Sequence, residues 1–385
     1  MRTLTTRLWP LAALSLYLTT ACGPSDPNDV PVAYPFALPE GTAAPRVPPD
    51  NPMSADKVRL GRRLFFDRQL SLNQTQSCGS CHLPSRAFTD GRATSMGSTG
   101  QLTPRNAMSL TNIGYASALT WANPSLGELE RQALIPMFGD TPVELGLSGQ
   151  EGELLTRLRA DAMYPAMFRR AFSADSDPVT VTNVARAIAS FERTLISFNA
   201  PYDRYVRGDR SAMTASAVRG LELFNTERLE CYHCHSGFNF SDATVSEGSA
   251  PREAPFHNTA LYNIDGRGAY PAPNRGVLEV STRPEDMGRF RAPSLRNIEL
   301  TAPYMHDGSI ATLEQVIAHY AAGGRRITEG PNAGDGSTSP LKSDLLRGFT
   351  LTDAERDDLL AFLRALTDRR FVEDPRFQDP FGRER

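Results

Sequence analysis

Positive charge is neither abundant nor concentrated in this 385-residue sequence. Lys and Arg number 41 against 44 Asp and Glu, which gives a formal net charge of −3. Binding to nucleic-acid phosphates needs a concentrated basic face, so nucleic-acid partners are excluded. Long hydrophobic runs are also missing, because the apolar stretch at residues 8–18 is shorter than the ~20 residues that cross a bilayer. No later stretch is long enough either, so we expect no membrane-spanning helix.

Cysteine and histidine are scarce as well. The chain has five Cys and six His, and four of the cysteines fall into two Cys-x-x-Cys-His motifs. The motifs are Cys78-Gly79-Ser80-Cys81-His82 and Cys231-Tyr232-His233-Cys234-His235. The fifth cysteine, Cys22, has no other cysteine left to pair with, which excludes a disulfide framework.

Each motif places two thiols where they can add to the vinyl groups of a haem, and it sets the following His beneath the iron. Zinc is the rival, but zinc ribbons pair their cysteine units roughly 15–20 residues apart, whereas these motifs lie 153 positions apart. The sequence therefore predicts two covalently bound haem c groups. The first would be held by Cys78 and Cys81, the second by Cys231 and Cys234, with His82 and His235 as proximal iron ligands. His233 is interpreted as an exposed loop residue.

The distal position of each iron decides function, because a six-coordinate haem transfers electrons whereas an open iron can bind peroxide. No His lies between His82 and His233, so the loop after the first motif cannot supply a distal His. Met96 and Met108 could close that site, but methionine is more often core filler. We expect the first haem to be open and to bind hydrogen peroxide.

The N-terminal residues have the layout of an export signal: Arg2 and Arg7, the apolar residues 8–18, and then Thr19-Thr20-Ala21-Cys22. We expect residues 1–21 to be removed as a signal peptide. Small residues directly before Cys22 are typical of lipoprotein cleavage, and the alternative is ordinary cleavage after Ala21. Residues 22–52, rich in Pro, Asp and Gly, would form a flexible tether in the periplasm, lipid-anchored to the outer membrane through Cys22 alone.

Hydrophobic periodicity indicates a mainly α-helical chain with long loops and little sheet. Helices are predicted at residues 54–67, 126–134, 151–172, 179–198, 212–225, 312–321 and 352–366, and loops at 87–123 and 236–300. Ser54 is the N-cap candidate of the first helix, and Pro201 is expected to end the fourth. The pairs Leu64-Phe65 and Leu223-Phe224 each precede a haem motif, which indicates a duplicated helix-then-haem unit. We predict two tandem cytochrome c-like domains, at residues 53–205 with the peroxide haem and at residues 206–385 with the low-spin haem.

Beyond the haem motifs, four further regions are similar to the bacterial dihaem cytochrome c peroxidase and MauG family. They are Leu64-Phe65-Phe66-Asp67 with Leu70-Ser71, Phe191-Glu192-Arg193-Thr194, Pro293-Ser294-Leu295-Arg296-Asn297, and Thr301-Ala302-Pro303-Tyr304-Met305-His306-Asp307-Gly308. The resemblance covers nearly the whole chain after the tether. It implies two cytochrome c domains, a calcium ion between the haems, and reaction with hydrogen peroxide at the N-terminal haem.

The resemblance also separates two branches of the family by the distal ligand of the second haem. That ligand follows the Thr of a Thr-x-Pro element by 19 residues, which from Thr301 reaches Tyr320; it is Met in the peroxidases and Tyr in MauG-like enzymes. A phenolate is a hard anionic ligand that stabilises oxidised iron, whereas a thioether stabilises Fe(II). The resemblance therefore implies the MauG-like branch. His319 is the alternative ligand, although on a helix it points ~100° away from Tyr320.

Four residues resemble the family's catalytic residues. Trp121 resembles the Trp that bridges the two haems and is the candidate relay between them. Gln132, Pro136 and Glu144 resemble the distal pocket of the peroxide haem, where a carboxylate can take the first peroxide proton and return it to the leaving oxygen. Glu144 lies two residues farther from Pro136 than the family pattern has it.

For calcium, the resemblance implies the side chain of Asn106 and the backbone carbonyls of Thr301 and Pro303, with waters completing an oxygen shell. Asn112 is the alternative to Asn106, and nothing local in the sequence separates them. His306 and Arg296 are expected to meet haem propionates or to hold the domain interface.

The implied function is a peroxide-dependent dihaem oxidoreductase that oxidises a side chain of a periplasmic partner protein through a high-valent dihaem state. Residues 119–124 and 138–140 resemble branch members that oxidise a Trp of the partner to kynurenine. The alternative is a cytochrome c peroxidase that reduces peroxide with electrons from a small cytochrome or cupredoxin. A third possibility is a dihaem electron carrier with no enzymatic activity.

Overall fold

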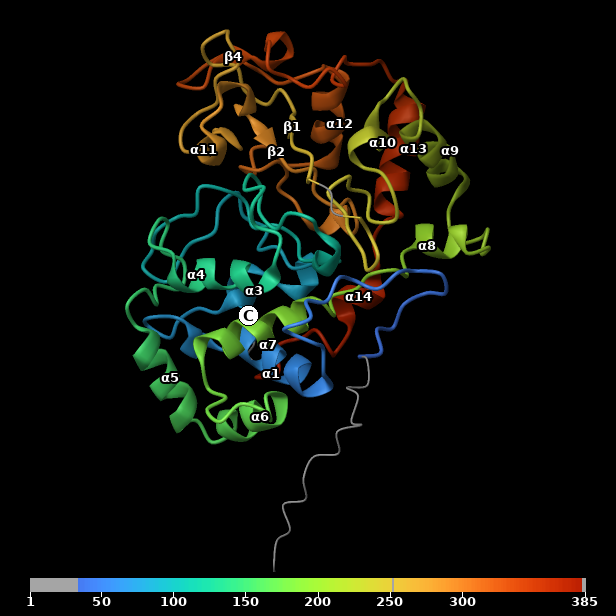
Figure 1. The fold of residues 1–385 in the computed structure, drawn as a ribbon. Coiled ribbons are helices and arrows are strands. Elements are labelled where there is room, and N and C mark those ends of the chain that lie inside the picture. Colours follow the sequence, from blue (N-terminus) through green and yellow to red (C-terminus); the bar gives the residue numbers. More distant parts are fainter. Residues whose placement is uncertain (1–33, 251–252, 383–385) are drawn as a thin grey trace, which may run out of the picture. The chain divides into compact units, whose positions relative to one another are not determined.

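Helices and long loops make up most of the chain and sheet is almost absent, as the sequence predicts (Figure 1). The computed structural model describes residues 34–250 and 253–382, which belong to one compact unit. The predicted signal peptide, Cys22 and residues 22–33 of the predicted tether lie outside the described residues. Residues 34–52, predicted as the rest of that flexible tether, instead pack against the chain: the Ala43 carbonyl accepts the Tyr115 hydroxyl at 2.9 Å, and Asn51 is fully buried. Within those residues, no helix combines the length and the apolar character needed to cross a membrane.

The helices are short and follow one another along the chain. They are α1 (Ala55–Phe66), α2 (Cys78–Cys81), α3 (Leu129–Gln132), α4 (Leu134–Phe138), α5 (Glu151–Ala160), α6 (Tyr164–Ala171), α7 (Val181–Glu192), α8 (Pro201–Val206), α9 (Ala215–Phe224), α10 (Cys231–Cys234), α11 (Leu278–Ser281), α12 (Leu313–Ala321), α13 (Asp353–Arg364) and α14 (Arg369–Glu373). The strands form two antiparallel pairs, β1 (His257–Asn258) with β2 (Arg289–Phe290) and β3 (Arg326–Ile327) with β4 (Gly334–Asp335).

Side-chain caps begin three of the helices, and the cap predicted at Ser54 is confirmed. The Ser54 hydroxyl accepts the Lys57 N–H at 3.2 Å at the start of α1, and the Thr312 hydroxyl caps α12 in the same way. At α13, Thr352 and Glu355 form a reciprocal capping box. Each cap satisfies N–H groups that have no partner inside the helix, so these helices begin close to where the sequence places them.

The first hydrophobic cluster forms where α1 crosses α7. A Cβ at Gly61 would lie 1.8 Å from the carbonyl oxygen of Ala187, so only glycine allows this close approach of the two helices. Next to the crossing, the Phe65 and Phe191 rings pack edge to face with centroids 5.3 Å apart. Phe65 also lies next to the first haem motif, with its ring centroid 6.4 Å from that of His82.

The second hydrophobic cluster repeats this arrangement where α9 crosses α13. A Cβ at Gly220 would lie 1.9 Å from the carbonyl oxygen of Asp358, and the Phe224 and Phe362 rings pack 5.1 Å apart. Gly220 precedes its Leu-Phe pair by three positions, as Gly61 does. The duplication that the Leu-Phe pairs indicate therefore extends to the glycine at the helix crossing.

Replacing Gly61 or Gly220 by Ala should destabilise the haem-loaded protein. The added methyl group would meet a carbonyl oxygen of the facing helix, and overpacking of this kind costs roughly 1–3 kcal/mol. Gly152→Ala on α5 is the matched control, because a Cβ there meets nothing within 4 Å. Thermal unfolding should show a lower Tm for the two crossing variants and an unchanged or higher Tm for the control. Equal effects at all three positions would contradict the close-approach argument.

The C-terminal helix α14 returns to the first cluster. Phe371 packs against Phe88 with ring centroids 5.8 Å apart, and Phe371, Val372 and Phe377 all belong to the first cluster. The last part of the chain thus helps to cover the first haem motif. The division into domains at residues 53–205 and 206–385 stays a prediction.

Two of the predicted helices are shorter than the sequence indicates. The helix predicted at 151–172 is divided into α5 and α6, because the Asp161 carboxylate accepts the N–H groups of Met163 and Tyr164 and starts a new helix there. The helix predicted at 179–198 ends at Glu192. Beyond it, the backbone N–H of Ser197 donates to Oδ1 of Asn112 at 2.7 Å. Tertiary hydrogen bonds therefore replace the last predicted turns.

Two smaller differences concern prolines and glycines. Pro201 does not end a helix but is the first residue of α8, a position where its missing N–H costs nothing. The helix predicted at 126–134 begins only at Leu129, two residues after Gly127, and continues as the separate helix α4.

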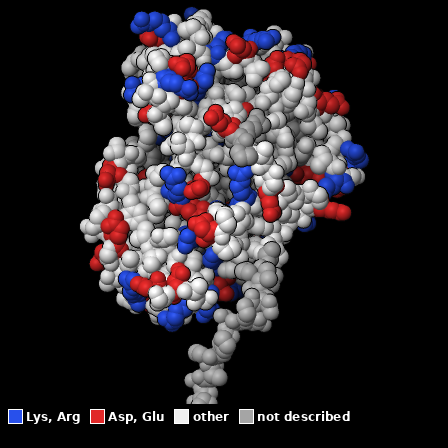
Figure 2. All heavy atoms as spheres, in the orientation of Figure 1, with Lys and Arg blue, Asp and Glu red and all other residues white. Residues whose placement is uncertain are grey.

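Figure 2 shows Lys and Arg side chains interspersed with Asp and Glu on the visible face, in keeping with the near-neutral composition.

Candidate functional site

Two cavities each contain one Cys-x-x-Cys-His motif. The first cavity has a volume of about 270 Å³ and is lined by Cys78, Cys81 and His82, among others. The second cavity has a volume of about 300 Å³ and is lined by Cys231, Cys234 and His235, among others. None of these four cysteines forms a disulfide. Each motif therefore presents two thiols and an imidazole to one internal space.

The two histidines are held in the same way. Nδ1 of His82 lies 2.7 Å from the carbonyl oxygen of Phe88, and Nδ1 of His235 lies 3.1 Å from that of Phe240. Both phenylalanines have a positive φ, which turns their carbonyls toward the rings. A carbonyl only accepts, so Nδ1 carries the proton in each ring and Nε2 keeps its lone pair.

This donor set fits two covalently attached haems. Burial lowers the pKa of both His82 and His235, which keeps the rings in the neutral form that binds iron. The second cavity also has unpartnered polar atoms in its wall, because Arg291 Nε and His306 Nε2 are buried without a hydrogen-bond partner. A group with apolar faces and acidic edges, such as a haem, would satisfy them.

The three predicted distal residues line the first cavity together with His82. Gln132 lies at the end of α3, Pro136 lies within α4, and Glu144 lies in the loop that follows. The Pro136 carbonyl accepts the N–H of Leu145 at 2.8 Å, which holds the Glu144 loop against α4. Burial raises the pKa of Glu144. The two-residue insertion thus does not remove Glu144 from the cavity.

Neither methionine alternative is well placed to close the first cavity, although both line it. The Met96 side chain is 45% exposed to solvent. The Met108 sulfur accepts a hydrogen bond from Arg291 at 3.4 Å. These contacts favour an open iron position in the first cavity.

Glu192 is a cavity residue that the sequence reasoning left without a role. It lies at the end of α7, lines the first cavity and is 5% exposed. Its Oε2 atom has no hydrogen-bond partner, and burial raises its pKa to about 8 although the guanidinium of Arg193 opposes that rise. The sequence feature that could have identified Glu192 is a carboxyl group at the end of an otherwise apolar helix face.

Replacing Glu192 by Gln should raise stability at alkaline pH. The folded-state pKa of about 8 lies above the ordinary value of 4.5, so the unfolded chain releases the proton first and stability falls as pH rises between those values. Gln does not titrate, so the free energy of unfolding of Glu192→Gln should exceed that of wild type by an amount that grows over that pH range to on the order of 1–4 kcal/mol. Melting curves against pH measure this, with the exposed Glu153→Gln as control. Parallel curves for wild type and Glu192→Gln would contradict it.

The second cavity contains Tyr320, on the last turn of α12. Burial raises the pKa of its hydroxyl, so the phenol is neutral unless a cation faces it. The neighbouring His319 does not line this cavity, and its Nε2 lies 2.9 Å from the carbonyl oxygen of Thr259. Of the two candidate ligands, only Tyr320 shares a cavity with His235.

Trp121 lines both cavities. Its Nε1–H donates to the carbonyl oxygen of Asn106 at 2.9 Å, and its own carbonyl accepts the N–H of Arg291 at 2.8 Å. One hydrogen bond therefore holds the indole and another holds the backbone of Trp121 between the two haem motifs.

A third, smaller cavity of about 70 Å³ adjoins Trp121 and is lined by Asn106, Thr301 and Pro303. Asn112 lines it too, but its amide is already used: Oδ1 accepts the Ser197 N–H at 2.7 Å and Nδ2 donates to the Ser197 carbonyl at 3.3 Å. The structure thus separates two asparagines that the sequence could not. The Asn106 amide nitrogen donates to the Arg92 carbonyl, which leaves the side-chain oxygen of Asn106 for a ligand.

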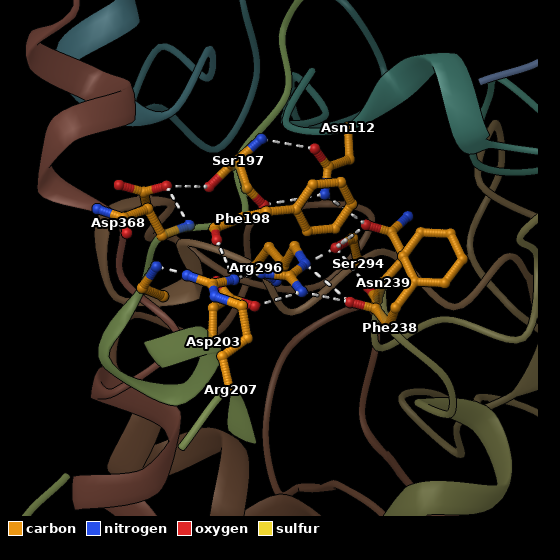
Figure 3. A network of polar contacts seen from close by, with 12 residues as sticks. Asn112, Ser197, Phe198, Asp203, Arg207, Phe238, Asn239, Ser294, Arg296 and Asp368 are labelled. Carbon is orange, nitrogen blue, oxygen red and sulfur yellow. Dashed lines mark hydrogen bonds and ion pairs between the residues drawn. The ribbon is translucent and has the colours of Figure 1, made fainter. Parts of the chain in front are cut away.

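Arg296 holds a buried polar network instead of facing a cavity (Figure 3). Its guanidinium makes two hydrogen bonds of 2.9 Å to the Asp203 carboxylate and donates to the Phe238 carbonyl. Its plane also lies over the Phe198 ring at 4.7 Å. Arg296 therefore joins α8 to the loop after the second haem motif.

His306, by contrast, lines the second cavity. Its ring stacks on Phe290 with centroids 3.7 Å apart, and burial lowers its pKa to about 4. The ring is therefore neutral. Of the two residues expected to meet haem propionates or to hold the domain interface, His306 lies at the second cavity, whereas Arg296 lies in the buried network with Asp203 and Phe238.

Comparison with known proteins gives consistent results. The family model described as di-haem cytochrome c peroxidase matches residues 55–211. Cytochrome-c peroxidase IdrP1 from Denitromonas iodatirespirans is 36% identical over 86% of this chain and 87% of its own. Methylamine utilization protein MauG from Methylorubrum extorquens is 34% identical over 86% of this chain and 83% of its own.

Among solved structures, the chain is similar to a MauG-like protein associated with microbial copper homeostasis. The two share 52% sequence identity and superimpose with a TM-score of 0.89, over 91% of this chain and the whole of the other.

Proposed function

Because the chain belongs to the di-haem cytochrome c peroxidase and MauG family, and is a peroxide-dependent oxidoreductase with two haem c groups, we propose that it acts in the MauG-like manner. In this proposal hydrogen peroxide reacts at the first haem, and a side chain of a separate partner protein is oxidised. The 52% identity to a MauG-like protein supports this branch.

The observation that carries the proposal is the position of Tyr320. It lines the second cavity with His235, which supports a phenol as the ligand of the second haem, whereas the peroxidase branch has a thioether there. Its buried hydroxyl has a raised pKa, so it would ionise only against a strong positive charge such as ferric iron. An anionic ligand favours oxidised iron, and this suits storage of oxidising equivalents better than uptake of electrons from a carrier.

In the first cavity, Glu144 and Gln132 would prepare peroxide for O–O cleavage. The raised pKa of Glu144 brings the carboxyl closer to neutral pH, where it can both accept and return a proton. Gln132 can orient the peroxide through its amide, and Pro136 limits the space between them. When bound, the first haem supplies an iron atom with a free coordination position.

Trp121 would connect the two centres electronically. It lines both cavities, and its hydrogen bonds to Asn106 and Arg291 keep it in one orientation. We also propose one calcium ion in the small cavity next to it, bound by the Asn106 side chain and the Thr301 and Pro303 carbonyls, since hard cations prefer such oxygen donors.

The remaining parts of the proposal concern location. The sequence before residue 34 favours export to the periplasm, and Cys22 favours a lipid anchor in the outer membrane. The partner protein would then be periplasmic as well.

The alternative is a peroxidase that draws electrons from a small cytochrome or cupredoxin, and the identity to cytochrome-c peroxidase IdrP1 supports it. Steady-state turnover of peroxide with a reduced small cytochrome as donor distinguishes the two. A peroxidase would consume the donor continuously, with two electrons per peroxide. Our proposal predicts little donor consumption and, in a mixture with the partner, a covalent change in the partner that mass spectrometry detects.

A further inference from the structure

The two haem motifs differ in the residues between their cysteines. In the first motif these are Gly79 and Ser80, and a Cβ on Gly79 would lie 2.3 Å from the Phe66 ring, so the motif is packed against the core there. In the second motif they are Tyr232, which is half-buried, and His233, which is exposed. Only the second motif, on α10 (Figure 1), brings oxidisable side chains to the surface.

Tyr232 is embedded in a small hydrogen-bonded cluster at the rim of the second cavity. Its hydroxyl donates to Oε1 of Glu227, an exposed residue that lines this cavity. The His233 ring packs on the Tyr232 ring with centroids 4.2 Å apart. Nε2 of His233 lies 2.9 Å from a Glu230 carboxylate oxygen and 3.4 Å from one of Glu227.

This geometry suits reversible oxidation of a phenol. A tyrosine loses its proton when it loses an electron at neutral pH, so an acceptor must already be hydrogen-bonded to it. The carboxylate of Glu227 is that acceptor, and the hydrogen bond raises the pKa of Tyr232 so that the phenol holds its proton until oxidation. Trp121 cannot serve at the surface, because it lies between the cavities, and the other Trp of the chain, Trp9, lies in the predicted signal peptide.

We propose that Tyr232, paired with Glu227, is the residue through which oxidising equivalents leave the second haem centre for the partner protein, an inference that rests on the proposed function. After peroxide has oxidised the haem-loaded protein, the Tyr232 phenol would give one electron to the second haem centre. At the same time the phenolic proton moves to Glu227. The partner side chain then gives one electron to the Tyr232 radical, and Glu227 returns the proton. Two such passes supply two electrons, which together with two protons from solvent reduce one hydrogen peroxide to two water molecules.

The test is rapid-freeze EPR of the haem-loaded protein after mixing with hydrogen peroxide. Wild type, Tyr232→Phe and Glu227→Gln are compared with Tyr205→Phe, a half-buried tyrosine on α8 that lies over Arg210 and lines neither cavity. Ring-deuterated tyrosine identifies a tyrosyl radical by narrowing its signal. Wild type and Tyr205→Phe should show this radical, and Tyr232→Phe should lose at least nine-tenths of it. Glu227→Gln should form it more slowly.

A parallel measurement separates this inference from the proposed function. The Soret absorption change reports the reaction with peroxide itself. In Tyr232→Phe, the tyrosyl radical signal should fall much more than this absorption change does. An undiminished radical in Tyr232→Phe, with a normal Soret change, would overturn the role of Tyr232 and leave the proposed function standing. A wild type whose all-ferric form gives no Soret change would overturn both.

The pairing with Glu227 has a readout that needs no peroxide. In an alkaline absorbance titration, one tyrosine should ionise at higher pH in wild type than in Glu227→Gln, and the difference should vanish in the Tyr232→Phe background. Identical titration curves for wild type and Glu227→Gln would overturn the pairing.

Discussion

Replacing Tyr320 by Phe should change the ligation of the second haem and abolish partner oxidation, while the first haem still reacts with peroxide. Phe fills the same space without an oxygen, so the second iron would lose its anionic ligand. The EPR spectrum of the ferric protein should then lose its low-spin component and gain a second high-spin one. Partner oxidation, followed by mass spectrometry, should fall by at least about 10-fold.

Tyr304→Phe is the matched control for this experiment. Tyr304 also lines the second cavity, but its hydroxyl already donates to the carbonyl oxygen of Ile298 at 3.1 Å. Its removal should leave the EPR spectrum of the second haem as in wild type. If Tyr320→Phe kept the wild-type low-spin spectrum, Tyr320 would not be an iron ligand.

Replacing Glu144 by Gln should slow the reaction of the all-ferric protein with peroxide by roughly 10²–10⁴-fold, the usual contribution of a positioned acid–base group. Gln keeps the size of the side chain but cannot accept the peroxide proton. The wild-type rate should also change with pH as Glu144 titrates, at a pH above the ordinary range of a glutamate because burial raises its pKa. The variant should lose that dependence.

Stopped-flow Soret measurements at several pH values give these rates. Glu151→Gln is the control, since Glu151 is an exposed carboxylate in the first turn of α5. A Glu144→Gln rate within a few-fold of wild type would show that another group handles the proton. Glu192 would then be the first candidate, because it is a buried carboxyl in the same cavity.

Much of this molecule could be predicted from local patterns. The spacing of cysteines and histidines identifies the two haem motifs, and the structure places each in its own cavity. The caps at Ser54, Thr312 and Thr352 depend only on neighbouring residues, so the starts of these three helices lie close to where the sequence predicts them. The register that leads from Thr301 to Tyr320 depends on the family resemblance, and the cavity around His235 agrees with it.

Other features depend on residues that are far apart in the sequence, and local patterns could not predict them. The helix after Thr180 ends early because Ser197 bonds to Asn112, 85 positions away. The same bond engages the Asn112 side chain and leaves Asn106 as the calcium candidate. Glu192 is only one more helix residue until the fold closes a cavity over it.

The reaction of the all-ferric, haem-loaded protein with hydrogen peroxide tests the central claim most directly. Because the first cavity has no distal His and the second contains Tyr320, we expect an immediate change in the Soret band when peroxide is added, without any reductant. Stopped-flow absorbance on the fully oxidised protein, and on the same protein after addition of one electron per molecule, makes the comparison. Equal or faster reaction of the all-ferric form is the predicted result; a reaction seen only after one-electron reduction would contradict the account.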